Sequence, residues 1–247
     1  MGMKETKILG VGFNRLTMAD ALEEISTYMI QDKPHLIVTA NPEMVMLAKD
    51  DQLLEEIMER ADLVVADGIG VVWASRILGQ SVPERIPGIE LAEGLLRRAN
   101  EQGWRVFLLG GAEGVAKQAA QSLKDTMPQL QIVGTYHGYF QTGSEEQALI
   151  HQIKQANPHL LLVALGVPRQ EKWLAAHLGA LKVPVAIGVG GSFNVWAGVD
   201  QRAPLWMRKI HLEWFYRLVK QPWRIKRMAV LPKFVGTVWL TRLRKGR

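Results

Sequence analysis

The feature that most constrains the fold is an alternation of short apolar runs with segments of helical periodicity. Seven runs have the length and composition of buried strands, at residues 7–11, 35–40, 63–66, 105–109, 131–135, 159–165 and 183–189. Amphipathic segments lie between or after them, at residues 18–30, 51–60, 69–78, 91–101, 115–126, 145–155 and 170–178. Nearly continuous apolar strands separated by helices are typical of a sheet covered on both faces. We therefore predict an α/β fold with a mostly parallel sheet flanked by helices.

The residues that directly follow the predicted strands are unusually polar and rich in glycine. Open parallel sheets bind ligands outside the carboxyl ends of their strands, so these exits are where a site is expected. They read TANPE from Thr39, ADG from Ala66, GGAEG from Gly110, LGVPRQE from Leu165 and GVGGSFN from Gly188. Each one alone is typical of a turn or a helix cap. Five such exits at one sheet edge together predict a binding site.

Two glycines end the run at residues 105–109 and precede a helical segment. Gly110 and Gly111, with Gly114 before the helix, would let a phosphate approach the backbone N–H groups closely. The spacing is not that of the dinucleotide-binding fingerprint, and GVGFNR from Gly10 lacks the third glycine. No Walker sequence is present. We infer a nucleotide diphosphate as the ligand, with a soluble nucleotide-dependent oxidoreductase as an alternative that the incomplete fingerprint disfavours.

Several kinds of chemistry are excluded by what the sequence lacks. It contains no cysteine, which removes disulfides, thiolate metal ligands and thiol nucleophiles. Its six histidines are scattered and it has no Asp-x-Asp, so neither a metal site nor a cofactor is expected. No apolar stretch approaches the roughly 18 residues of a membrane-spanning helix. A phosphate leaving group would therefore be neutralised by arginines or backbone dipoles.

Charge divides the chain into two unequal parts. Residues 202–247 hold 13 Lys and Arg and one acid, a net charge of +12, whereas residues 1–201 hold 17 bases and 23 acids, a net charge of −6. Four of the eight tryptophans also lie after residue 201. Bases mixed with Trp are typical of helices that lie on an anionic membrane surface. We predict an α/β catalytic domain at 1–201 and a basic membrane-binding appendage at 202–247.

The basic segment has helical spacing from Leu205 to Val219. We predict one helix that begins at Pro204, followed by shorter helices separated at Pro222 and Pro232. Apolar faces of this kind are poorly satisfied in water, so we expect the segment to be mobile, or to form a homo-oligomer, until it meets a bilayer. Two alternatives stay open, a basic helical pair packed on the body and a nucleic-acid-binding arm. An arm does not explain the Trp and Leu faces, so no nucleic acid is expected.

Taken together, the motifs resemble the WecG/TagA/CpsF glycosyltransferase family. In chain order they read TANPEMV, ADGIGVVWASR, LGGAEGVA, HGYF, LGVPRQEKW, GVGGSFNVWAG and RAPLWMRKIHLEWFYRLVKQPWRIKR, and they span residues 8 to about 230. The resemblance implies a Rossmann-like fold and an inverting, metal-independent transferase. The implied reaction moves N-acetylmannosamine from UDP-N-acetylmannosamine to the 4-hydroxyl of N-acetylglucosaminyl-diphospho-undecaprenol. Its product is the β-1,4-linked disaccharide lipid of wall teichoic acid linkage.

The resemblance also bears on the sugar, the location and the basic segment. A UDP-N-acetylmannosaminuronic acid transferase of the same family is the alternative, because the two sugars differ by one oxidised carbon. The implied location is cytoplasmic, peripheral on the inner face of the bacterial cell membrane. The basic segment is implied to bind that membrane and to complete the active site.

The resemblance assigns roles to individual residues. Asp67 resembles the family's general base, which takes the proton from the acceptor hydroxyl as that oxygen attacks the anomeric carbon. The expected substrate-binding residues are Thr39, Asn41, Arg85, Gln170, Gly110, Gly111, Gly190, Gly191, Asn194, Arg217, Arg224 and Arg227. The last three arginines are expected to reach the donor diphosphate. The family usually has Asp where Asn194 stands, and an Asn accepts hydrogen bonds through one oxygen only.

Overall fold

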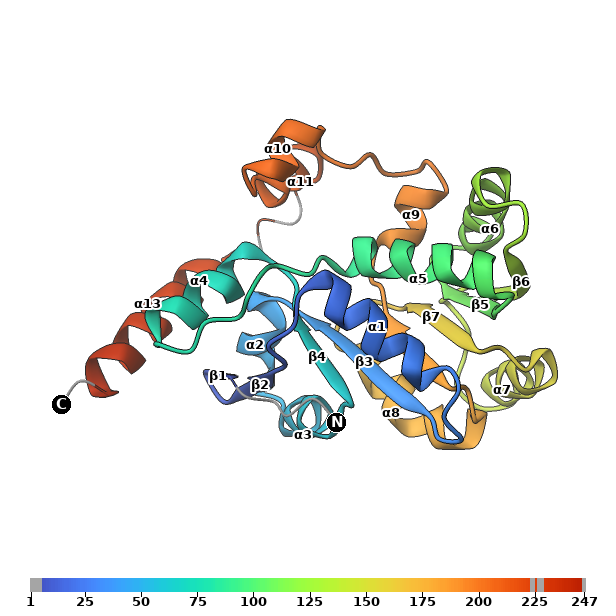
Figure 1. Ribbon diagram of the computed structural model, residues 1–247, viewed down its shortest axis with the longest axis horizontal. Helices are drawn as coiled ribbons and strands as arrows, with labels where there is room; N and C mark the ends of the chain where they lie inside the picture. Colours follow the sequence, from blue (N-terminus) through green and yellow to red (C-terminus); the bar gives the residue numbers. More distant parts are fainter. Residues whose placement is uncertain (1–5, 223–224, 226–228, 246–247) are drawn as a thin grey trace.

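The computed structural model describes residues 6–222, 225 and 229–245, and its centre is a six-stranded sheet (Figure 1). The strands are β3 (His35–Ala40), β4 (Leu63–Ala66), β5 (Arg105–Gly110), β6 (Gln131–Tyr136), β7 (Leu160–Ala164) and β8 (Val185–Gly188). They lie in the order β4-β3-β8-β7-β5-β6, and each pair of neighbours is parallel. The predicted α/β class with a parallel sheet is confirmed.

Helices cover both faces of this sheet, which explains why its strands are almost continuously apolar. On one face the core includes side chains from α2 (Pro42–Ala48), α3 (Gln52–Arg60), α4 (Ile69–Ile77), α7 (Ser144–Ala156) and α8 (Arg169–Leu181). On the other face it includes side chains from α1 (Met18–Tyr28), α5 (Gly88–Gln102), α6 (Val115–Thr126) and α9 (Ser192–Trp196). After β5 and β8 the chain continues into α6 and α9, which cover the second face. After β7, the strand between them, it continues into α8 on the first face. In open α/β sheets, ligands bind at such a point, outside the carboxyl ends of the strands.

The strand predicted at residues 7–11 is wrong. That stretch forms an antiparallel hairpin of β1 (Thr6–Ile8) and β2 (Val11–Phe13), which lies outside the main sheet. Leu9 and Gly10 make the turn with φ angles of 52° and 101°. Two-residue hairpin turns of this kind need positive φ at both positions. The turn reverses the chain where the apolar pattern alone indicates a single strand.

The basic segment folds as separate helices. Those described are α10 (Leu205–Lys209), α11 (Glu213–Lys220) and α13 (Val230–Lys245). The single helix predicted over residues 205–219 is wrong, because the chain breaks between α10 and α11, where His211 has a φ of 61°. Pro232 does not separate two helices either. It lies in the first turn of α13, where the missing N–H of proline costs no helical hydrogen bond.

The last helix, α13, packs on the body. Phe234 and Val238 are fully buried in the core that contains α2 and α4. Trp239 meets Trp73 of α4 edge-on, with 6.4 Å between the ring centroids. Figure 1 shows α13 running beside α4 at one end of the molecule. The division of the chain at residue 201 stays a prediction, but α13 shares the core of the residues that precede that boundary.

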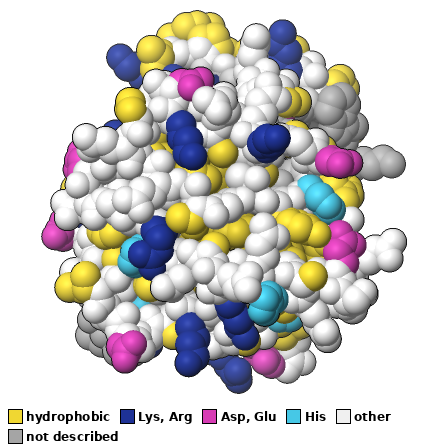
Figure 2. Space-filling view, turned by 90° about the vertical axis from the view of Figure 1, so that its right-hand side faces the viewer, with side chains coloured by type: hydrophobic (Ala, Val, Ile, Leu, Met, Phe, Trp, Pro, Cys, Tyr) yellow, Lys and Arg dark blue, Asp and Glu magenta, His cyan; other side chains and the backbone are white. Residues whose placement is uncertain are grey.

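Exposed apolar side chains gather in the basic segment. The large ones are Leu205, Trp206, Ile210, Trp214, Phe215, Val219, Ile225, Val235, Trp239, Leu240 and Leu243. On the face that carries α6 and α7, basic and acidic side chains are instead interspersed, with hydrophobic side chains between them (Figure 2). Among the described residues, no helix combines the length and the apolar character needed to cross a bilayer.

Candidate active site

Asp67 and Asn41 come together at the ends of two neighbouring strands. Asp67 follows β4 and Asn41 follows β3, and the backbone N–H of Asp67 donates to the carbonyl oxygen of Ala40 at 2.9 Å. The next residue, Gly68, has a φ of 115°, and a Cβ placed on it would meet Pro42 Cδ at 3.5 Å and Asn41 Cβ at 3.9 Å. The structure thus brings the proposed base and one of its predicted polar neighbours side by side.

Asn41 also has a structural task. Its Oδ1 accepts from the backbone N–H of Met44 at 3.0 Å, which caps α2, and Pro42 occupies the first position of that helix. Capping of this kind satisfies a backbone donor that would otherwise have no partner within the helix. The cap fixes the orientation of the amide and leaves the NH₂ group of Asn41 for another acceptor, such as a sugar oxygen.

Thr39 connects three elements at this edge. Its hydroxyl donates to the carbonyl oxygen of Gly188, the last residue of β8, at 3.4 Å. It also lies against Gly88, where α5 begins, since a Cβ there would fall 2.8 Å from Thr39 Oγ1. The start of α5 can approach β3 this closely only because residue 88 has no side chain.

Arg85 lies half-buried in the segment between α4 and α5. The next residue, Ile86, donates its backbone N–H to the carbonyl oxygen of Ala66 at 2.8 Å. This bond holds the segment across the end of β4, directly before Asp67. Arg85 is therefore placed at the same edge as Asp67, as a pocket residue must be.

Gly110 and Gly111 end β5 in tight contact with β7. Their φ angles are 133° and 72°, and a Cβ on Gly110 would lie 2.4 Å from the carbonyl oxygen of Ala164. The N–H of Gly111 donates to that same oxygen at 3.0 Å. Because this N–H already has a partner, a diphosphate would meet the residues that follow, where α6 begins behind Gly114 without a side-chain cap.

Gln170 holds the exit of β8. It is buried at the start of α8, its Oε1 accepts from the backbone N–H of Gly190 at 3.2 Å, and its Nε2 donates to Glu171 Oε1 at 2.8 Å. Gly188 makes room for both side chains, since a Cβ there would lie 2.4 Å from Gln170 Nε2 and 3.0 Å from Glu171 Oε1. The predicted site residues Gly190 and Gly191 thus lie on a loop that Gln170 positions.

Glu171 is a candidate that was not predicted from the sequence. It is 2% exposed, and burial raises its pKa to about 7, partly offset by the hydrogen bond from Gln170. Its Oε2 makes no hydrogen bond within the described part of the chain. Glu171 shares the buried face of α8 with Leu174 and Leu178. Glu171 could have been recognised from the sequence, because it occupies a position where the helical spacing calls for an apolar residue and it lies next to a predicted site residue.

Asn194 is joined to the basic segment through Asp200. Its Nδ2 donates to Asp200 Oδ2 at 3.1 Å, and Asp200 Oδ1 accepts from Gln221 Nε2 at 2.8 Å. The backbone N–H of Asp200 also donates to the carbonyl oxygen of Asn194 at 2.9 Å. Asn194 therefore acts here as a donor to a carboxylate, which an Asp at this position could not do.

Arg202 makes a second connection between the body and the basic segment. Its Nη2 lies 2.7 Å from Glu90 Oε1 of α5 and 3.4 Å from Glu213 Oε2 of α11. The side chains of Arg202 and Glu213 are only 12% and 11% exposed. Because Glu90 stands in the first turn of α5, which begins beside Thr39, this bridge holds α11 near the carboxyl edge of the sheet.

The arginines predicted to reach a diphosphate are only partly described. Arg217 belongs to α11, whereas Arg224 and Arg227 lie outside the described residues. Their role stays a prediction. Arg169, at the start of α8, is engaged within the protein: its Nη1 donates to the carbonyl oxygen of Gly138 at 2.8 Å and its guanidinium lies 5.1 Å from the centroid of the Phe140 ring.

Two histidines lie at the amino ends of strands, away from this edge. His35 stacks on Tyr28 with 3.9 Å between ring centroids, and its Nδ1 lies 3.0 Å from Asp62. His159 Nδ1 accepts from the backbone N–H of Arg105 at 2.9 Å. Burial lowers the pKa of both histidines. Across the described ranges, His, Asp and Glu nowhere form a group of three or more that could hold a metal ion.

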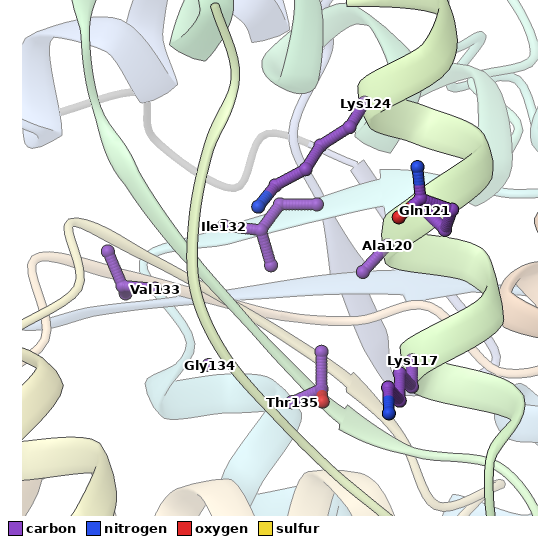
Figure 3. Close-up of a pocket in the computed structure, with 8 residues that line it drawn as sticks. All are labelled: Lys117, Ala120, Gln121, Lys124, Ile132, Val133, Gly134 and Thr135. Atoms are coloured by element: carbon purple, nitrogen blue, oxygen red, sulfur yellow. The ribbon is translucent and has the colours of Figure 1, made fainter. Parts of the chain in front are cut away.

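A hollow between α6 and β6 lies apart from these residues (Figure 3). Lys117, Gln121 and Lys124 line it from the helix, and Ile132 and Thr135 line it from the strand. None of the predicted site residues contributes to it. The strand is irregular there, because its register against β5 shifts between residues 106 and 107. Bulges of this kind protect sheet edges from pairing with other chains.

Comparison with known proteins covers both parts of the chain. The model of the family described as "Glycosyl transferase WecG/TagA/CpsF family" matches residues 6–247. Similar proteins include the N-acetylglucosaminyldiphosphoundecaprenol N-acetyl-beta-D-mannosaminyltransferases of Staphylococcus aureus strains MW2 and NCTC 8325 / PS 47. Each is 38% identical over 230 residues, which cover 92% of this chain and 89% of the relative. The family match includes the sheet with its polar exits and the basic segment alike.

Proposed function

Because the chain belongs to the WecG/TagA/CpsF family of glycosyl transferases, we propose that it transfers N-acetylmannosamine from UDP-N-acetylmannosamine to N-acetylglucosaminyldiphosphoundecaprenol. The observation that carries this proposal is the 38% identity, over 92% of the chain, to relatives named for that acceptor and that sugar. The product would be the β-1,4-linked disaccharide lipid of wall teichoic acid linkage. The reaction would invert the configuration of the anomeric carbon.

Asp67 is the proposed general base. Its carboxylate takes the proton from the 4-hydroxyl of the acceptor sugar while that oxygen forms a bond to the anomeric carbon of the donor. The bond from the anomeric carbon to the diphosphate breaks on the opposite side, and UDP leaves with the electron pair. The position of Asp67 beside Asn41 and the segment of Arg85 supports this role, because polar side chains there can orient a sugar.

The donor diphosphate is proposed to lie along the exits of β5 and β8. The first turn of α6 offers backbone N–H groups to phosphate, and the loop of Gly190 and Gly191 follows β8 at the same edge of the sheet. The negative charge that develops on UDP requires cations or dipoles placed in advance. Arg217, Arg224 and Arg227 are the proposed source of that positive charge, and the Arg202 bridge holds α11, to which Arg217 belongs, near this edge.

The basic segment, residues 202–247, is proposed to rest on the inner face of the cell membrane, where a lipid-linked acceptor would be found. Its exposed apolar side chains and its net charge of +12 support this placement. Each base near an anionic surface contributes roughly 1 kcal/mol to binding. Residues 1–201 would then carry the general base, and residues 202–247 would complete the active site with their arginines. Away from a membrane, the same apolar surface would favour self-association.

The test is a transfer assay with the full chain. Purified protein is incubated with UDP-N-acetylmannosamine and N-acetylglucosaminyldiphosphoundecaprenol in anionic vesicles that contain EDTA, and both UDP and the lipid product are measured. We expect UDP release that depends on the acceptor, and a lipid that has gained one N-acetylhexosamine. Transfer from UDP-N-acetylmannosaminuronic acid alone would overturn the proposed sugar. Absence of UDP release with either donor would overturn the proposed function.

A further inference from the structure

Glu171 is a buried carboxyl group with no part in the transfer described above. Its Oε1 accepts from Gln170 Nε2 at 2.8 Å, and its Oε2 makes no hydrogen bond among the described residues. A carboxyl group buried with one oxygen unsatisfied is costly, and an apolar side chain of similar volume would serve packing better. This cost indicates that Glu171 serves to make its hydrogen bond to Gln170 and not to fill the core.

The orientation of the Gln170 amide depends on that hydrogen bond. Gln170 Oε1 accepts from the N–H of Gly190 at 3.2 Å, so the oxygen must face Gly190. Turned by half a rotation, the amide would point its NH₂ group at that N–H, donor against donor. Glu171 Oε1 accepts from the NH₂ group and therefore favours the orientation in which Gln170 Oε1 faces the N–H of Gly190.

The end of β8 leaves room for the side chains of Gln170 and Glu171. Gly188 has no side chain, and a Cβ there would lie 2.4 Å from Gln170 Nε2 and 3.0 Å from Glu171 Oε1. From the other side, the hydroxyl of Thr39 donates to the carbonyl oxygen of Gly188 at 3.4 Å. The strand exit that leads to Gly190 is thus held from both sides, by β3 and by α8.

We infer that Glu171 is a positioning residue for the donor site, because it fixes the Gln170 amide that holds Gly190 at the exit of β8. The inference rests on the proposed function, in which this exit borders the donor. Burial raises the pKa of Glu171 to about 7. At neutral pH both protonation states are therefore present, and each offers Gln170 an acceptor oxygen.

Two variants of Glu171 separate positioning from packing. Glu171→Gln keeps an acceptor oxygen, whereas Glu171→Met keeps the approximate volume without one. We expect Glu171→Met to raise the KM for the donor about tenfold, with a change in kcat of less than about threefold, as the loss of one hydrogen bond to a binding loop would do. Glu171→Gln should stay within about threefold of wild type in both constants.

A matched control is Glu146→Gln. Glu146 of α7 is also a partly buried carboxylate that binds α8, through Trp173 Nε1 at 2.9 Å and His177 Nε2 at 3.2 Å. It faces other residues of α8, so its variant should leave the donor KM unchanged. An equal rise in KM for Glu146→Gln and Glu171→Met would mean that any disturbance of α8 has this effect, and the inference would fall.

A double-mutant cycle tests whether Glu171 acts through Gln170. In a Gln170→Ala background the hydrogen bond is already lost, so adding Glu171→Met should change the donor KM by less than about twofold. If Glu171→Met costs as much in that background as in wild type, Glu171 acts elsewhere and the inference is wrong.

Hydrogen exchange supplies a measurement that needs no substrate. The backbone amide of Gly190 should exchange about tenfold faster in Glu171→Met than in wild type, and at nearly the wild-type rate in Glu171→Gln. If the Gly190 amide exchanges at the wild-type rate in Glu171→Met, the inference is overturned. If that amide exchanges faster as expected but the wild-type protein transfers no sugar, only the proposed function is overturned. If Glu171→Met does not fold, Glu171→Asp, which withdraws the carboxylate by one methylene, replaces it in both measurements.

Discussion

The side-chain amide of Asn194 donates to one oxygen of Asp200 at 3.1 Å, and the other oxygen of Asp200 accepts from Gln221 at 2.8 Å. A single carboxylate thus ties α9 to the residue that follows α11. The arrangement accounts for an amide at position 194, because a carboxylate there would have no proton to donate to Asp200 at neutral pH.

The variant Asn194→Asp should destabilise the folded protein by about 1–3 kcal/mol at neutral pH, because it replaces a charge-assisted hydrogen bond by repulsion between two carboxylates. Adding Asp200→Asn should recover most of the loss, since the amide and the carboxylate then exchange places. Urea unfolding of both variants and wild type measures this. A single variant as stable as wild type would show that the hydrogen bond contributes nothing.

Asp67→Asn should keep the fold and the donor affinity while it lowers turnover about a hundredfold or more. The matched control is Asp62→Asn, just before the amino end of the same strand, where Asp62 accepts from the backbone N–H of Leu36 at 3.0 Å. The Asp62→Asn variant should be less stable than wild type, but the molecules that stay folded should turn over at the wild-type rate. Steady-state kinetics with unfolding curves distinguishes the two, and near wild-type turnover in Asp67→Asn would remove Asp67 from the role of base.

Arg202→Met should release α11 from the body. It leaves Glu90 and the buried Glu213 without this cation, and loss of one partner from a buried ion pair costs roughly 3–5 kcal/mol. We expect faster proteolysis of residues 205–222 and a fall in transfer to a short-chain, water-soluble acceptor. Lys209→Ala removes an equal charge at an exposed position and serves as the control. Equal proteolysis rates for the two variants would contradict a bridging role.

Stability should depend on pH through Glu171. Burial raises its pKa from the ordinary 4.5 to about 7, so the folded state binds more protons than the unfolded chain between those values. Its contribution to the free energy of unfolding is therefore greatest below about pH 4.5 and is lost as the pH rises through 7, a change on the order of 3 kcal/mol. The difference in unfolding free energy between wild type and Glu171→Gln, measured by urea unfolding across this window, should follow that course. A difference that does not vary with pH would contradict the raised pKa.

Phe234→Ala should destabilise the whole protein by about 3 kcal/mol, because it leaves a cavity between α13 and the helices α2 and α4. Val235→Ala, at the exposed neighbouring position, should change stability by less than about 0.5 kcal/mol. Thermal unfolding followed by circular dichroism compares them. If Phe234→Ala melts like Val235→Ala, α13 is attached only loosely to the body.

Local patterns in the sequence determined the α/β class and the positions of the main strands. Apolar runs, helical periodicity and glycine-rich exits are properties of short stretches, so they can be read without knowing what lies opposite them. The same locality explains the failures. The breaks at Leu9 and His211 depend on positive φ angles, which few residues other than glycine adopt and which the identity of a single residue does not fix.

Only the tertiary structure decided the strand order, the docking of α13 on α2 and α4, and the pairing of Asn194 with Asp200. Each depends on which distant residues meet, and a sequence shows only that a side chain needs burial or a partner. Glu171 is the clearest case. Its raised pKa arises from the removal of water by the elements that pack around α8, and its place beside Gln170 at the exit of β8 arises from a glycine seventeen positions further on, Gly188. Desolvation of this kind exists only in the folded chain.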